Sequence, residues 1–194
     1  MAPIAARNWK LGHRRPILWG MITEPTAMPN PTGPAPRLAA GMRIGHVHLK
    51  VADLERGLGF WRDLLGLEEQ QRIGAQAVFL SADGYHHHIA LNTWESAGGS
   101  PPPAGTTGLF HVALLYPDRA ALARVLKRLV EARYPLDGAS DHGVSEALYL
   151  RDPDGNGVEL YRDRPQAEWP RDAEGGLAMV TQRLDLRALL AEAG

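Results

Sequence analysis

One segment of this chain is repeated later in the sequence. Residues 46–53 read His-Val-His-Leu-Lys-Val-Ala-Asp, and residues 111–118 read His-Val-Ala-Leu-Leu-Tyr-Pro-Asp, so His, Val, Leu and the final Asp recur at a constant offset of 65 residues. The pair Asp83-Gly84 recurs as Asp154-Gly155 at an offset of 71, so the second half carries six extra residues. A duplicated unit of about 50–60 residues predicts two similar modules that share one core.

Each copy carries the pattern of a strand, a helix and three further strands. Residues 44–51 alternate apolar and polar side chains, and Asp53 then caps a helix whose apolar residues form one stripe as far as Leu65. Three short strands are expected near residues 67–73, 75–81 and 86–94. A second helix with one apolar face follows Asp118, after a linker rich in Gly and Pro.

We predict an α+β fold of two tandem βαβββ modules, which form one cupped mixed β-sheet with the helices on its convex side. The modules span residues 43–95 and 108–163 within a domain of residues 42–165. Residues 1–41 contain seven prolines and no lasting periodicity, which predicts a disordered or extended N-terminal arm. Residues 166–194 are predicted to be a C-terminal tail with a short helix near its end, where four leucines cluster.

Composition excludes several classes of partner and chemistry. The net charge of −1 gives no electrostatic reason to expect nucleic acid or an anionic membrane. No apolar run is long enough to span a bilayer, and we expect a cytoplasmic protein for which a homodimer is one possible assembly. The absence of cysteine excludes disulfides and thiolate ligands, which leaves His, Asp and Glu as candidate metal ligands.

A carboxylate stands between two apolar residues near the end of the second copy. Residues 152–157, Asp-Pro-Asp-Gly-Asn-Gly, are dense in turn residues and predict a β-hairpin. In the outgoing strand Glu159 faces away from Val158 and Leu160. An unpaired carboxylate on a buried strand is costly. Either that face of the strand is solvated, or Glu159 binds a cation.

The duplication also relates two histidines to each other. His46 and His111 occupy equivalent positions of the two modules and can face each other across the concave side of the sheet. Together with Glu159 they make two imidazoles and one carboxylate, the ligand set of non-haem Fe(II) oxygenases. We therefore predict a metal site formed by His46, His111 and Glu159. His48 shares a face with His46, but its counterpart in the second copy is Ala113; the ordinary alternative is that each His is a semi-buried strand residue.

These residues resemble a known family. The repeated His-Val-x-Leu opening and the Asp-Pro-Asp-Gly-Asn-Gly-Val-Glu-Leu ending are similar to the vicinal oxygen chelate superfamily, which includes glyoxalase I, extradiol dioxygenases and bleomycin-binding proteins. The resemblance covers about residues 43–165 and is closest to the bacterial catechol-2,3-dioxygenase-like branch. It implies a fold, a metal site and a small-molecule substrate, whereas the reaction varies within such a fold.

The resemblance implies three catalytic residues. Extradiol dioxygenases carry a Tyr ten residues before the ligand Glu, and Tyr149 has that spacing from Glu159. They also carry a His-His-x-aliphatic-Ala strand whose second His assists proton transfer, which nominates His87. A further His lies in the loop before the Tyr strand and matches His142, although an apparent small insertion, Glu146-Ala147, alters the spacing.

The histidine run at residues 86–88 leaves an alternative open. Counting from the duplicated turn makes His88, not His87, the counterpart of Glu159. Because side chains alternate along a strand, the two cannot both face the metal from regular β-structure. An inward His88 predicts four protein ligands, as in glyoxalase I, whereas an inward His87 predicts three ligands and a separate acid/base. The longer sequence match favours His87.

The leading hypothesis is a metal-dependent extradiol-type dioxygenase that cleaves a catecholic or similar small aromatic substrate with O₂. Fe(II) is the expected metal, with Mn(II), Zn(II) or Ni(II) as alternatives. A second hypothesis is a glyoxalase-like metal-dependent isomerase or lyase with four protein ligands. A third is a non-catalytic small-molecule binding or resistance protein, against which the complete ligand set argues.

Overall fold

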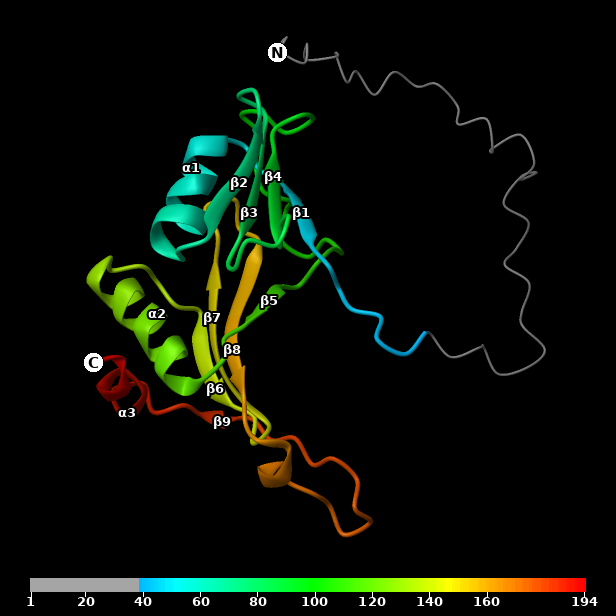
Figure 1. Cartoon of the computed structure of the whole chain (residues 1–194), viewed down its shortest axis with the longest axis vertical. Coiled ribbons are helices and arrows are strands. Elements are labelled where there is room, and N and C mark those ends of the chain that lie inside the picture. The colour runs from blue at the N-terminus through cyan, green and yellow to red at the C-terminus, as the bar shows by residue number, and fades with distance from the viewer. Residues whose placement is uncertain (1–38) are drawn as a thin grey trace, which may run out of the picture. The chain divides into compact units, whose positions relative to one another are not determined.

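The computed structural model describes residues 39–194, and the arm expected over residues 1–41 therefore falls almost wholly outside the described part of the chain. The first module contains β1 (Val47–Lys50), α1 (Leu54–Leu58), the π-helical turn η2 (Gly59–Leu64), β2 (Glu68–Ile73), β3 (Ala77–Ser81) and β4 (Ile89–Asn92). The second module contains β5 (Val112–Leu115), α2 (Arg119–Glu131), β6 (Gly138–Asp141), β7 (Ser145–Arg151) and β8 (Gly157–Asp163). The C-terminal segment adds η3 (Gln166–Glu168), β9 (Gln182–Arg183), α3 (Leu186–Leu190) and η4 (Ala191–Ala193) (Figure 1).

The two modules have the same topology. Their hydrogen bonds form a four-stranded sheet in the order β1-β4-β3-β2 and a five-stranded sheet in the order β5-β8-β7-β6-β9. In each module the first strand pairs in parallel with the last, and the other pairs are antiparallel. The α+β class and the tandem βαβββ arrangement are therefore confirmed, with the strands hydrogen-bonded as one mixed sheet per module.

The helices begin where the sequence predicts. Asp53 and Asp118 cap α1 and α2, and their carboxylates accept hydrogen bonds from the backbone amides of Arg56 at 2.8 Å and Ala121 at 2.7 Å. Such caps satisfy amides that have no partner in the first helical turn. The first helix does not continue regularly to Leu65, however, because it widens into η2.

The widened turn contains two adjacent aromatic residues that are both buried. The Leu65 amide donates to the carbonyl of Phe60, five residues earlier, at 2.9 Å. The adjacent aromatic residues Phe60 and Trp61 are both buried, with 2% and 0% of their surface exposed. An ordinary helix turns adjacent side chains about 100° apart, whereas the extra residue in a π-turn changes that spacing. The apolar stripe predicts the helix but not this local change in its winding.

The turn at residues 152–157 joins the two modules. The Asp152 carboxylate accepts hydrogen bonds from two backbone amides of its own turn and, at 3.4 Å, from the indole nitrogen of Trp61. Asp154 accepts from the Ala52 amide at 2.9 Å and from Arg56 at 2.5 Å. Gly157 lies so close to β5 that a Cβ atom there would be 2.0 Å from the carbonyl oxygen of Phe110. The predicted hairpin is confirmed, and it also holds the first module against the second.

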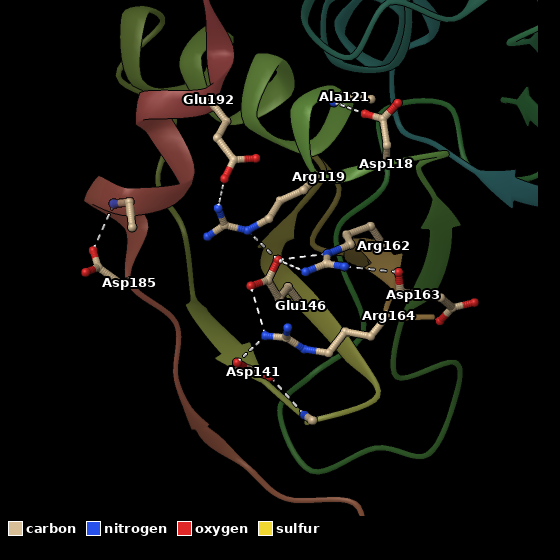
Figure 2. Close-up of polar contacts among 12 residues, drawn as sticks. Asp118, Arg119, Ala121, Asp141, Glu146, Arg162, Asp163, Arg164, Asp185 and Glu192 are labelled. Atoms are coloured by element: carbon tan, nitrogen blue, oxygen red, sulfur yellow. Dashed lines mark hydrogen bonds and ion pairs between the residues drawn. The ribbon is translucent and has the colours of Figure 1, made fainter. Parts of the chain in front are cut away.

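A buried carboxylate organises the opposite end of the second module. Glu146 on β7 is 3% exposed and is contacted by Arg119 from α2 and by Arg162 from β8, both at 2.8 Å (Figure 2). Arg164 donates to the same carboxylate at 3.2 Å and to Asp141 at 2.6 Å. Arg119 also pairs with Glu192 in η4. One carboxylate thereby ties α2, β7, β8 and the C-terminus together.

The C-terminal segment is part of this module. β9 pairs with β6 in antiparallel register, and Leu189 of α3 is fully buried in the core. The short C-terminal helix predicted from the leucines is confirmed as α3, which packs beside α2. Within residues 39–194, no helix has both the length and the apolarity needed to cross a membrane.

Candidate active site

The site is built on the first and last strands of the second module. His111 immediately precedes β5, and Glu159 lies on β8, opposite Ala113 in the parallel register. The Nε2 atom of His111 lies 2.9 Å from Oε2 of Glu159, whose side chain is 13% exposed. Two of the three predicted metal ligands therefore present their donor atoms to one another.

Tyr149 and His142 extend this contact into a chain. Tyr149 lies opposite Glu159 across the antiparallel β7–β8 pair, and its hydroxyl lies 3.1 Å from the Oε1 atom of that residue. The Nε2 atom of His142 is 2.8 Å from the same hydroxyl. Burial, together with the adjacent carboxylate of Glu159, raises the pKa of Tyr149 to about 12. The Tyr149 hydroxyl therefore keeps its proton near neutral pH and can donate it in a hydrogen bond.

The hydroxyl proton has two possible acceptors. A phenol has a single proton to donate, and the Tyr149 hydroxyl lies within hydrogen-bonding distance of both Glu159 and His142. If the Nε2 atom of a neutral His142 accepts from the Tyr149 hydroxyl, no proton remains for the contact with Glu159. If Nε2 carries a proton and donates it, Tyr149 can donate its own proton to Glu159. The chain from His142 to His111 can thus exist in two arrangements, which differ in whether the Nε2 atom of His142 carries a proton.

The first module supplies a separate cluster of histidines. The rings of His46 and His87 lie 4.2 Å apart, and Phe79 of β3 lies 5.0 Å from His87. Burial and the neighbouring His46, His86, His48 and His88 lower the pKa of His87. A neutral imidazole near pH 7 is the form that can accept a proton.

His88 points elsewhere. Its Nδ1 atom lies 3.2 Å from the Ser81 hydroxyl, and its ring lies 5.1 Å from that of Tyr85. The structure therefore places His87 beside His46 and holds His88 at the β3–β4 turn. The two side chains have different neighbours, as alternation along a strand requires, and the backbone of His88 already pairs with Leu80 and Val47.

The three predicted metal ligands are divided between these clusters. His111 and Glu159 lie together, whereas His46 lies with His87 and His86. Across residues 39–194 no three His, Asp or Glu side chains gather closely enough to hold a metal ion. The Nδ1 atom of His111 is buried without a hydrogen-bond partner. The paired nitrogen and oxygen donors fit part of a divalent-metal site, and His46 remains the predicted third ligand.

A shallow pocket of about 350 Å³ adjoins this pair. His111 and Tyr149 form part of its wall together with Phe110, which is 81% exposed, and the ion pair of Arg151 with Asp137 at 3.0 Å. The repeat and the motifs of the sequence do not single out Phe110 or Asp137. The signal that could have found Phe110 is its place next to a candidate ligand, because an exposed aromatic residue beside such a group favours binding of a ring.

The sequence matches a family model over most of the described chain. The model, described as the Glyoxalase/Bleomycin resistance protein/Dioxygenase superfamily, matches residues 43–160. A catechol-2,3-dioxygenase of Bacillus subtilis is 44% identical over 151 residues, which cover 78% of this chain and 52% of that protein. Biphenyl-2,3-diol 1,2-dioxygenase 3 of Rhodococcus globerulus is 34% identical over 62% of this chain and 63% of that protein. The chain thus spans between half and two thirds of the length of these relatives.

Solved structures agree in fold. A glyoxalase/dioxygenase from Nostoc punctiforme has a TM-score of 0.56 at 19% identity and covers 69% of this chain and 100% of that one. A glyoxylase/bleomycin resistance protein/dioxygenase domain from Frankia sp. EAN1pec has a TM-score of 0.53 at 23% identity and covers 63% of this chain and 98% of that one. These similarities agree with the duplicated βαβββ topology, and the family-model match over residues 43–160 shows that this chain belongs to the glyoxalase/bleomycin resistance/dioxygenase superfamily, also called the vicinal oxygen chelate superfamily.

Proposed function

We propose that this chain is an extradiol-type dioxygenase that opens the ring of a catecholic or similar small aromatic substrate with O₂. The observation that carries the proposal is the hydrogen-bonded chain from His142 through Tyr149 to Glu159 and His111, with successive separations of 2.8, 3.1 and 2.9 Å. Curated relatives named catechol-2,3-dioxygenase and biphenyl-2,3-diol 1,2-dioxygenase support the same reaction class.

The proposed metal is Fe(II), held by His111, Glu159 and His46. Two imidazoles and one carboxylate suit non-haem Fe(II), and Mn(II) is the main alternative because one relative, from Geobacillus genomosp. 3, is named as manganese-dependent. When bound, such a metal would supply Lewis-acid chemistry to the oxygens of the substrate and would activate O₂. The remaining steps depend on side chains of the two modules.

Tyr149 and His87 have separate roles in this proposal. In the arrangement in which His142 donates to it, the Tyr149 hydroxyl, which stays protonated near neutral pH, donates a hydrogen bond to a substrate oxygen as negative charge develops on it. His87 is kept neutral by its lowered pKa and accepts a proton from the substrate and returns it later. The pocket lined by Phe110 and Tyr149 receives the ring.

The four-ligand alternative depends on His88, which is engaged elsewhere. An isomerase or lyase of the glyoxalase I kind would use an inward-facing His88 as an additional ligand. Because His88 contacts Ser81 and Tyr85 instead, the arrangement favours three ligands and a separate base.

The direct test of the proposed function is metal analysis of protein purified without air, followed by O₂ uptake with a panel of catechols. Metal-loaded protein that consumes no O₂ with any catechol would contradict it.

Replacing His87 by alanine separates the two enzyme classes. We expect turnover of a catechol to fall by roughly 10²–10⁴, the usual contribution of one positioned acid or base, while the metal content stays unchanged. His88→Ala is the matched control, since it removes a neighbouring imidazole and should keep most of the activity. Loss of metal in His88→Ala but not in His87→Ala would favour the isomerase or lyase.

A further inference from the structure

The C-terminal segment between β8 and β9 contacts His142, the first residue of the series of contacts that leads through Tyr149 to Glu159. Residues 169–181, called here the C-terminal hairpin, close through a bridge between Arg171 and Leu177 and lie in the orange segment of Figure 1. The Ala178 amide donates to the carbonyl of Pro170 at 3.0 Å. The hairpin lies outside both βαβββ modules, and neither the duplication nor the ligand set requires it.

The hairpin meets the β6–β7 turn at His142. The Val180 amide donates to the His142 carbonyl at 3.1 Å, and the Nδ1 atom of His142 lies 2.9 Å from the Val180 carbonyl oxygen. Next to it, Gly143 has a positive φ of 75°, and a Cβ atom there would lie 2.9 Å from Pro170 and 3.3 Å from Val180. The two segments are therefore in close contact on both sides of the imidazole.

This contact determines which imidazole nitrogen carries a proton. A carbonyl oxygen only accepts hydrogen bonds, so the Nδ1 atom of His142 must donate to Val180. The Thr181 hydroxyl could favour the opposite tautomer by donating to Nδ1, but it lies 3.4 Å away, longer than the 2.9 Å contact with Val180. The shorter contact is the stronger hydrogen bond. In the neutral ring the Nε2 atom then carries only a lone pair and accepts from the Tyr149 hydroxyl, 2.8 Å away, and it can donate only after His142 takes up a second proton.

We infer that the C-terminal hairpin is a working part of the active site, in which the Val180 carbonyl fixes His142 with a proton on Nδ1 and its Nε2 atom toward Tyr149. Val180 is a positioning residue, because it acts through His142 and does so with its backbone. The catalytic consequence rests on the proposed function, whereas the tautomer does not. Spectra of the protein without metal or substrate can therefore test the inference even if the dioxygenase proposal fails.

The experiment is long-range ¹H–¹⁵N spectroscopy of protein labelled with ¹⁵N-histidine, recorded with His142 neutral and with its signals assigned by their loss in His142→Gln. We expect the Nδ1–H tautomer in the parent protein. Val180→Pro removes the amide that anchors the hairpin to His142 and should yield the Nε2–H tautomer or a mixture. Thr181→Val removes only the competing hydroxyl and should leave the Nδ1–H form unchanged.

A second pair of variants keeps the inference testable if Val180→Pro does not fold. Gly143→Ala places a methyl group against Pro170 and Val180, whereas Gly175→Ala imposes the same backbone strain at φ 80° with nothing within 4 Å. We expect the His142 tautomer to change in Gly143→Ala and not in Gly175→Ala. With an active enzyme, kcat should fall about tenfold or more in the first variant, with little change in KM. An Nε2–H tautomer in the parent, or an Nδ1–H form retained in every folded variant, would overturn the inference.

Discussion

Replacing His111 by alanine is expected to remove the bound metal and abolish turnover while leaving the fold intact. His111 and Glu159 present the only pair of predicted ligand atoms that already meet in the described chain, at 2.9 Å. Loss of a supporting partner of a metal ligand typically costs 10–100-fold in affinity, so loss of a ligand itself should cost roughly 100-fold or more. Metal content per chain and the thermal unfolding midpoint are the measurements.

The matched pair for this experiment lies in the first module. His46→Ala should also lose metal, whereas His48→Ala should keep it, because His48 hydrogen-bonds to Asn92 at 2.9 Å and its ring meets that of Trp94 edge to face. Both variants remove an imidazole from the same strand face. Full metal occupancy in His111→Ala, or equal losses in the two first-module variants, would show that the ligand set is wrong.

Replacing Glu146 by glutamine is expected to give the largest loss of stability among single polar substitutions in the second module. The change removes the negative charge that three arginine side chains share. Breaking a buried ion pair costs 3–5 kcal/mol because the opposite charge is left buried without its partner. The arginine side chains remain 12–26% exposed, which places the expected cost near the lower end, about 3 kcal/mol.

An exposed ion pair of the same module provides the control. The side chains of Arg151 and Asp137 are 55% and 51% exposed, and Asp137→Asn should change stability by less than about 1 kcal/mol. Denaturant unfolding of both variants, with the midpoint and slope measured together, compares the two losses. Equal effects on the free energy of unfolding would mean that the Glu146 network stabilises the fold no more than a surface ion pair does.

The role of Glu146 shows why part of the fold could not be predicted. In the sequence, Glu146 and Ala147 resemble a small insertion that alters the spacing between His142 and Tyr149, whereas in the structure both residues belong to β7. Glu146 falls on the same strand face as Leu148 and Leu150, where a carboxylate would be costly without its arginines. Those arginines come from α2, β8 and the segment after β8, and nothing in the local pattern indicates that they converge.

Part of the candidate site could likewise be predicted from the sequence, and part could not. The residue types and the pairing of His111 with Glu159 follow from the duplicated strand and the alternation of β8, so they could be predicted. For His87 and His88 the turn count and the longer sequence match disagree; the match favours His87, which the structure places beside His46. The ligand role of His46 stays a prediction, since the structure places it with His87.

The sequence by itself determined the two modules, the succession of their elements along the chain and the residues that cap their helices, because periodicity, turn residues and an internal repeat act over short stretches of chain. Only the tertiary structure decided which distant groups meet. Val180 reaches His142 across 38 residues, and Asp154 reaches Ala52 across 102. Such contacts depend on how the packed strands and hairpins place backbone atoms within about 3 Å of each other, and a local pattern carries no information on that distance.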